Sequence, residues 1–112
     1  MSFFDRQTVT VDIDAENSVT IRKLTYGERQ RCLSVAAKAR IDSAGNESVD
    51  IDPGRLSLER LFAAIVSWSG PGFAGHSVNR ENIEALPPEV LDSVTKALAA
   101  LSEGVSEGEK KL

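Results

Sequence analysis

Residues 68–76 read Trp-Ser-Gly-Pro-Gly-Phe-Ala-Gly-His and separate two apolar runs that have the spacing of helices. The first run ends at the only tryptophan of the chain, and the second follows Pro87 and Pro88. Glycine and proline interrupt regular structure, so this segment predicts a flexible link between two helices. A rigid aromatic side chain at such a link is typical of packing or docking rather than of catalysis.

The run before the link has the strongest apolar stripe in the chain. Asp52 and Pro53 favour a helix start here, because a carboxylate caps free backbone N–H groups and proline fits the first turn. We therefore expect a helix from Pro53 to about Trp68. Its apolar positions recur at helical spacing: Leu58, Leu61, Phe62, Ile65, Val66 and Trp68.

Two segments near the N-terminus alternate polar and apolar residues, which is typical of strands. They cover residues 8–13 and 18–24 and are joined by a four-residue turn, so they predict a β-hairpin. Thr25 and Glu28 then have the spacing of a helix capping box. We expect a thin, alanine-rich helix over 26–41, followed by a long polar loop over 42–52.

Beyond the link, Asn79 is a favourable cap for a short helical segment over 80–85. The last helix is expected over 88–101, with an apolar face of Val90, Leu91, Val94, Leu98 and Leu101. We expect residues 1–101 to form a single small domain and 102–112 a disordered tail. The predicted fold class is mainly α, of the α+β kind: an N-terminal β-hairpin, three main helices and a short helical turn.

The composition excludes several classes of function. The net charge of −4 over 112 residues argues against a general nucleic-acid-binding protein, which needs a basic surface. There is no apolar run of about 18 residues, so no membrane span is expected. The N-terminus lacks the pattern of a secretory signal, and the single cysteine cannot form an internal disulfide. These features favour a cytoplasmic location.

The residues that carry chemistry are few. Residues 70–75 match the pattern Gly-x-Gly-x-x-Gly, but a helix is expected before them and Pro71 lacks an N–H group, so we predict a loop without bound phosphate. One histidine and one cysteine cannot bind zinc. Cys32 and His76 could pair as nucleophile and base, but a buried thiol and a loop histidine is the preferred interpretation. We therefore predict no enzyme activity, catalytic residue, cofactor or metal.

Three segments, and the apolar helix that closes the chain, resemble the tail assembly chaperones of long-tailed, siphovirus-type bacteriophages. The first is Val-Thr-Ile-Arg-Lys-Leu-Thr over 19–25, leading directly into a capped helix. The second is Ile-Val-Ser-Trp-Ser-Gly over 65–70, and the third is Gly-His-Ser-Val-Asn-Arg-Glu-Asn-Ile-Glu-Ala-Leu-Pro-Pro-Glu over 75–89. The likeness covers about 19–101.

The resemblance implies a protein without catalytic activity. Such chaperones bind the tape measure protein in the host cell cytoplasm, recruit tail tube subunits and are absent from the mature virion. The resemblance also allows for a homo-oligomer, while the charge and hydropathy of the chain predict neither a nucleic-acid nor a membrane partner. The alternative is a structural tail or head–tail connector protein that stays in the virion.

The candidate partner-binding residues lie at the glycine-rich link and on the last helix. Aromatic and leucine side chains dominate both protein cores and interfaces, so each of these residues also has a simpler interpretation as part of the core. The predicted contacts are Trp68, Phe73, Leu91, Val94, Leu98 and Leu101.

Overall fold

The computed structural model describes residues 3–102. Its first sheet has three antiparallel strands in the order β1-β2-β5: β1 (Thr8–Asp12), β2 (Ser18–Arg22) and β5 (Ile65–Ser69). The predicted N-terminal hairpin is confirmed, because Val9 lies opposite Ile21 and Val11 opposite Val19. The third strand comes from far along the chain and places Trp68 opposite Val19.

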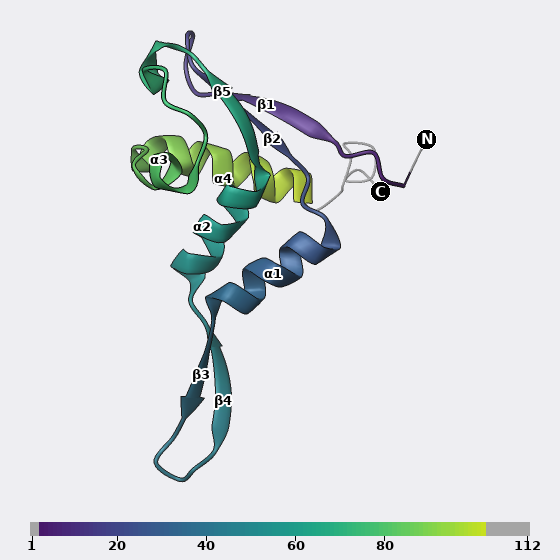
Figure 1. Cartoon of the computed structure of the whole chain (residues 1–112), viewed down its shortest axis with the longest axis vertical. Helices are drawn as coiled ribbons and strands as arrows, with labels where there is room; N and C mark the ends of the chain where they lie inside the picture. Colours follow the sequence, from purple (N-terminus) through teal and green to yellow (C-terminus); the bar gives the residue numbers. More distant parts are fainter. Residues whose placement is uncertain (1–2, 103–112) are drawn as a thin grey trace.

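Two helices lie side by side below this sheet (Figure 1). Helix α1 (Tyr26–Ala36) begins at the predicted capping box, in which Thr25 and Glu28 exchange hydrogen bonds. Helix α2 (Pro53–Ala64) begins at Asp52, whose carboxylate accepts the backbone N–H of Arg55. Both predicted helix starts are therefore confirmed.

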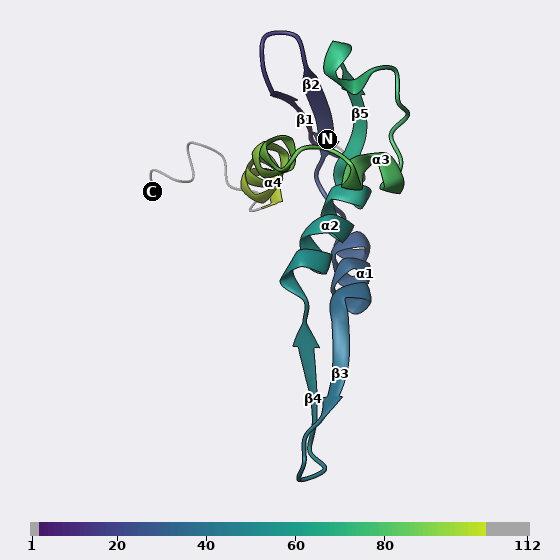
Figure 2. The ribbon, with the colours of Figure 1, turned by 90° about the vertical axis from the view of Figure 1, so that its left-hand side faces the viewer.

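A second sheet extends the two helices away from the rest of the molecule (Figures 1 and 2). It is a two-stranded ribbon of β3 (Ala37–Ile41) and β4 (Glu47–Ile51), and α1 runs directly into it while α2 follows it. We call residues 37–51 the arm. Every residue of the arm except Ala37 is exposed.

The chain after β5 forms a single 3₁₀ turn, η1 (Pro71–Phe73), and then two helices. Helix α3 (Arg80–Glu84) has the predicted cap at Asn79, and helix α4 (Pro88–Ser102) agrees closely with the expected last helix. Helix α4 lies against β1 and β2 (Figure 2). The predicted tail over 102–112 lies outside the described residues apart from Ser102, the last residue of α4.

One core joins the three-stranded sheet to α2, α3 and α4. Val19 and Ile21 of β2 are fully buried and face the helices. The remaining core residues are Leu24, Leu61, Ala64, Ile65, Phe73, Ile83, Val94, Leu98 and Leu101. The apolar stripe of α4 is therefore covered by the chain itself.

The prediction of a mainly α fold is wrong, because the chain is a mixed α+β protein with two small antiparallel sheets. The helix expected to reach Ile41 ends at Ala36, and the expected loop over 42–52 contains β4. The helix expected to reach Trp68 ends at Ala64. In each case a segment with alternating or β-branched residues pairs with a strand, which satisfies its backbone groups without a helix.

Candidate binding site

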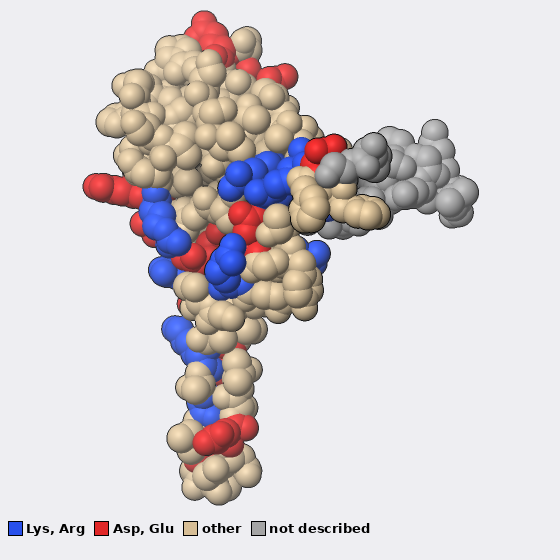
Figure 3. Space-filling model, turned by 45° about the vertical axis from the view of Figure 1, so that its right-hand side comes forward, with Lys and Arg blue, Asp and Glu red and all other residues tan. Residues whose placement is uncertain are grey.

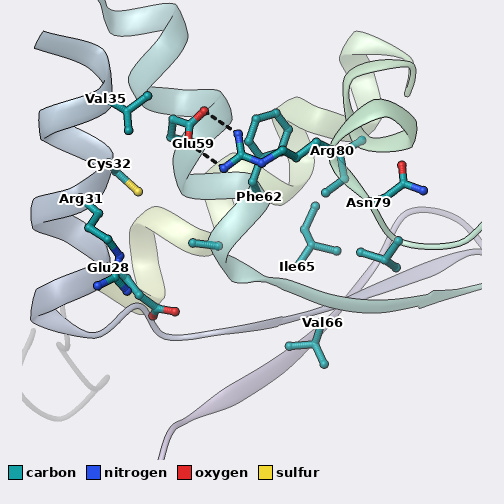
Figure 4. Close-up of a pocket in the computed structure, with 13 residues that line it drawn as sticks. Glu28, Arg31, Cys32, Val35, Glu59, Phe62, Ile65, Val66, Asn79 and Arg80 are labelled. Atoms are coloured by element: carbon teal, nitrogen blue, oxygen red, sulfur yellow. Dashed lines mark hydrogen bonds and ion pairs between the residues drawn. The ribbon is translucent and has the colours of Figure 1, made fainter.

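A cavity of about 510 Å³ opens between α1, α2, β5 and the start of α3 (Figure 4). Seven of its thirteen lining residues are apolar, and two of these, Val35 and Val66, are 50% and 47% exposed. This volume lies within the usual range of binding cavities, roughly 300–1,000 Å³. The apolar lining residues are Val35, Phe62, Ala63, Ile65, Val66, Val78 and Ile83.

A buried carboxylate forms one side of this cavity. Glu59 of α2 is only 5% exposed and forms ion pairs with Arg80, at 3.1 Å, and with Arg55, at 3.3 Å. The guanidinium of Arg80 donates to both carboxylate oxygens and lies 4.7 Å from the ring centre of Phe62. These contacts neutralise Glu59, and the pair with Arg80, drawn as dashed lines in Figure 4, holds α3 against α2.

A second carboxylate, that of Glu28 in the first turn of α1, also lines the cavity. Glu28 accepts the backbone N–H of Thr25 and forms ion pairs with Arg6 and Arg22. Burial alone raises the pKa of Glu28, but the hydrogen bond from Thr25 and the two arginines outweigh it and hold the pKa below its usual value. Glu28 therefore remains ionised near neutral pH, where its role is to join the N-terminal segment to α1.

The thiol of Cys32 lines the same cavity but is poorly suited to nucleophilic chemistry. It is buried, and burial and the nearby Glu59 raise its pKa. A raised pKa favours the neutral thiol, which is the less reactive form. His76 lines a different cavity, together with Trp68 and Phe73, so the structure does not bring the histidine into the cavity that contains Cys32.

The glycine-rich link contacts the turn of the N-terminal hairpin. The N–H of Gly72 donates to the side-chain oxygen of Asn17 at 2.8 Å. The next N–H groups, those of Phe73 and Ala74, donate to carbonyl groups within the link. Because these donors already have partners, the link packs against the hairpin instead of presenting these N–H groups to a phosphate.

The side chain of Trp68 contacts two residues of the glycine-rich link, Phe73 and His76. Its ring stacks on Phe73 with a centroid distance of 4.9 Å and an interplanar angle of 4°. Its indole N–H donates to the carbonyl oxygen of His76 at 2.7 Å. Trp68 is half-buried, so it both orders the link and exposes part of its surface.

The structure divides the predicted partner contacts into two groups. Trp68 and Leu91 are half-buried. Phe73, Val94, Leu98 and Leu101 are buried in the core. Partner binding by any of the six residues stays a prediction.

Reasoning from the sequence missed the apolar surface of the arm. Ile41, Val49 and Ile51 are 68%, 67% and 42% exposed. The signal was present, since Glu-Ser-Val-Asp-Ile over 47–51 alternates polar and apolar residues as a strand does. The cavity was missed for another reason: its walls come from elements far apart in the sequence.

Charged side chains of both signs are interspersed on the face shown in Figure 3, both around α1 and α2 and along the arm. Within residues 3–102, no helix combines the length and the hydropathy required to cross a bilayer. The same residues contain no group of three or more metal-binding side chains. No protein-family model, curated protein or solved structure matches this chain.

Proposed function

We propose that this chain is a bacteriophage tail assembly chaperone that has no catalytic activity. In this proposal it binds the tape measure protein in the host cytoplasm, recruits tail tube subunits and is absent from the finished particle. Two things support the proposal: the resemblance of residues 19–25, 65–70 and 75–89 to that family, and the open cavity between α1, α2 and β5, in which apolar side chains are exposed beside charged ones.

The cavity is the observation on which the proposal depends most. Val35 and Val66 stand exposed at its walls, while Phe62 and Ile83 lie deeper and are less exposed. Covering such apolar surface lowers the free energy of a protein in water. An amphipathic helix that places one or two apolar side chains into the cavity would cover it, and this is a common mode of peptide recognition.

The paired carboxylates of the cavity favour an apolar occupant over a cationic one. Glu59 is paired with Arg80 and Arg55, and Glu28 is paired with Arg6 and Arg22. A cationic ligand would have to compete with these arginines for the two carboxylates, whereas an apolar side chain can enter without disturbing the ion pairs. A long apolar helix, of the kind that a tape measure protein contains, meets this requirement.

Co-expression with the tape measure protein of the same genome tests the proposal. The wild-type chain should keep that protein soluble and should purify with it. Val35→Asp places a charge at the wall of the cavity and should abolish both effects without lowering the melting temperature, because Val35 is half exposed.

Ser34→Asp is the matched control. It adds the same charge at the neighbouring exposed position of α1, and it should behave as wild type. Equal loss of binding by both variants, or binding retained by both, would contradict a role for the cavity. Mass spectrometry of purified particles separates the chaperone from a retained tail or connector protein, since only the latter would be present.

A further inference from the structure

More arginines than carboxylates surround the cavity between α1, α2 and β5. Two carboxylates, Glu28 and Glu59, line it, and each forms ion pairs with two arginines. One further arginine belongs to the lining itself. Among the described residues, the lining and its ion-pair partners thus contain five arginines, which are Arg6, Arg22, Arg31, Arg55 and Arg80. This set of side chains carries an excess of positive charge, although the net charge of the chain is −4.

Arg31 is the arginine of this set that has no carboxylate of its own. It forms no ion pair within residues 3–102, and its side chain is exposed on α1 beside Glu28 (Figure 4). Glu28 lies three residues before it, but Thr25, Arg6 and Arg22 already bind the carboxylate oxygens of Glu28. An anion that reaches Arg31 therefore displaces no carboxylate of the described chain.

The acidic character of the whole chain does not oppose an anion at this place. At physiological ionic strength the Debye length is about 8 Å, so exposed charges farther away are largely screened. The arginines at the cavity therefore influence a bound group more strongly than the acidic residues of distant segments such as the arm.

The spacing along α1 relates this free cation to the apolar wall of the cavity. Arg31 and Val35 both line the cavity and are four residues apart, so they lie on one face of α1 about one turn, or roughly 5.4 Å, from each other. A helix that lies along α1 and contacts Val35 with an apolar side chain brings another side chain, one turn away, next to Arg31.

We propose that the helix bound in this cavity carries an acidic residue four positions from the apolar residue that contacts Val35, and that this carboxylate pairs with Arg31. The partner is then an acidic amphipathic helix rather than a purely apolar or a basic one. Arg31 selects the charge of the partner, a role that rests on the proposed function because that function supplies the helix.

Three synthetic helical peptides test this proposal. They share a central leucine and the apolar residues on its face, and they carry glutamate, glutamine or lysine both four residues before and four residues after that leucine. These three residues have similar helix propensities, and changing both positions covers either direction of the bound helix. Calorimetric titration of the wild-type chain should give a Kd for the glutamate peptide about threefold below that for the glutamine peptide, and the highest Kd for the lysine peptide.

Arg31→Gln should remove this preference, so that the glutamate and glutamine peptides bind with equal Kd values. Arg29→Gln is the matched control, because Arg29 is also exposed on α1 and has no ion pair in the described part of the chain, but it does not line this cavity. It should keep the threefold preference. Raising the NaCl concentration from about 50 mM to about 500 mM should reduce the preference of the wild-type chain.

Equal Kd values of the wild-type chain for the three peptides, or equal loss of the preference in both variants, would overturn the role of Arg31. Failure of the wild-type chain to bind the glutamate peptide would overturn it as well. These results are separable from the proposed function, because a chaperone that accepts purely apolar helices would still keep the tape measure protein soluble on co-expression. A glutamate preference without any effect on the tape measure protein would contradict the proposed function alone.

Discussion

Arg80 binds the buried carboxylate of Glu59 through two nitrogen atoms, at 3.1 and 3.3 Å. This ion pair connects α3, which follows the glycine-rich link, to the middle of α2. The same guanidinium covers the ring of Phe62. One arginine therefore positions the wall of the cavity and neutralises its most buried charge.

Removing this arginine should destabilise the chain. Arg80→Ala leaves Glu59 with Arg55 alone and should lower the free energy of unfolding by about 1–2 kcal/mol, since the arginine itself is largely exposed. Arg80→Lys should recover only part of this, because lysine cannot bind both oxygens in the same plane. Urea denaturation measures both variants, and an unchanged midpoint for Arg80→Ala would contradict the role assigned to this pair.

Trp68 should contribute to stability through its stack and its hydrogen bond. Trp68→Ala should cost about 3 kcal/mol, since it removes the contact with Phe73 and the bond to His76. Trp68→Phe retains an aromatic ring and should cost about 1 kcal/mol, the value of one hydrogen bond. Thermal unfolding of the two variants checks this order, and equal losses would show that stacking contributes little.

Gly70 cannot be replaced without moving the hairpin turn. Its φ is +127°, and a Cβ atom there would lie 2.4 Å from the carbonyl oxygen of Glu16. Gly70→Ala should therefore lower the free energy of unfolding by about 2 kcal/mol or more. Gly45→Ala is the control, because Gly45 also has a positive φ but faces open space, and it should cost only about 1 kcal/mol.

The stability should fall at acid pH partly because of Glu28. Its folded-state pKa lies below the ordinary value of 4.5, so its contribution is complete above that value and is lost as the pH falls through the folded-state pKa. Glu28→Gln removes this titration. The free energy of unfolding of the variant should therefore change less than that of wild type between about pH 5 and pH 3. Parallel curves for the two proteins would contradict the ion pairs with Arg6 and Arg22.

The sequence indicates every helix start because helix starts depend on local chemistry. Thr25 with Glu28, Asp52 with Pro53, and Asn79 each cap a helix within three residues of themselves. The helix ends were predicted less well. Ile65 and Val66 fit an apolar helix or a strand equally, and the pairing of β5 with β2 depends on residues more than forty positions away.

The candidate site was harder to predict than the helices. Its walls join Val35 of α1, Phe62 of α2 and Val78 of the link, and no local pattern brings these residues together. The apolar face of α4 presents the opposite difficulty. Its spacing correctly predicts an apolar face, but spacing cannot distinguish a face covered by the same chain from one that is left for a partner.

The central claim is that the cavity binds an apolar helix of the tape measure protein. Calorimetric titration of the purified chain with a soluble helical segment of that protein tests it most directly. Val66→Asp should raise the Kd at least about tenfold, and Ser67→Asp, at the next exposed position of β5, should leave it unchanged. Absence of binding to the wild-type chain, or equal Kd values for the two variants, would contradict the claim.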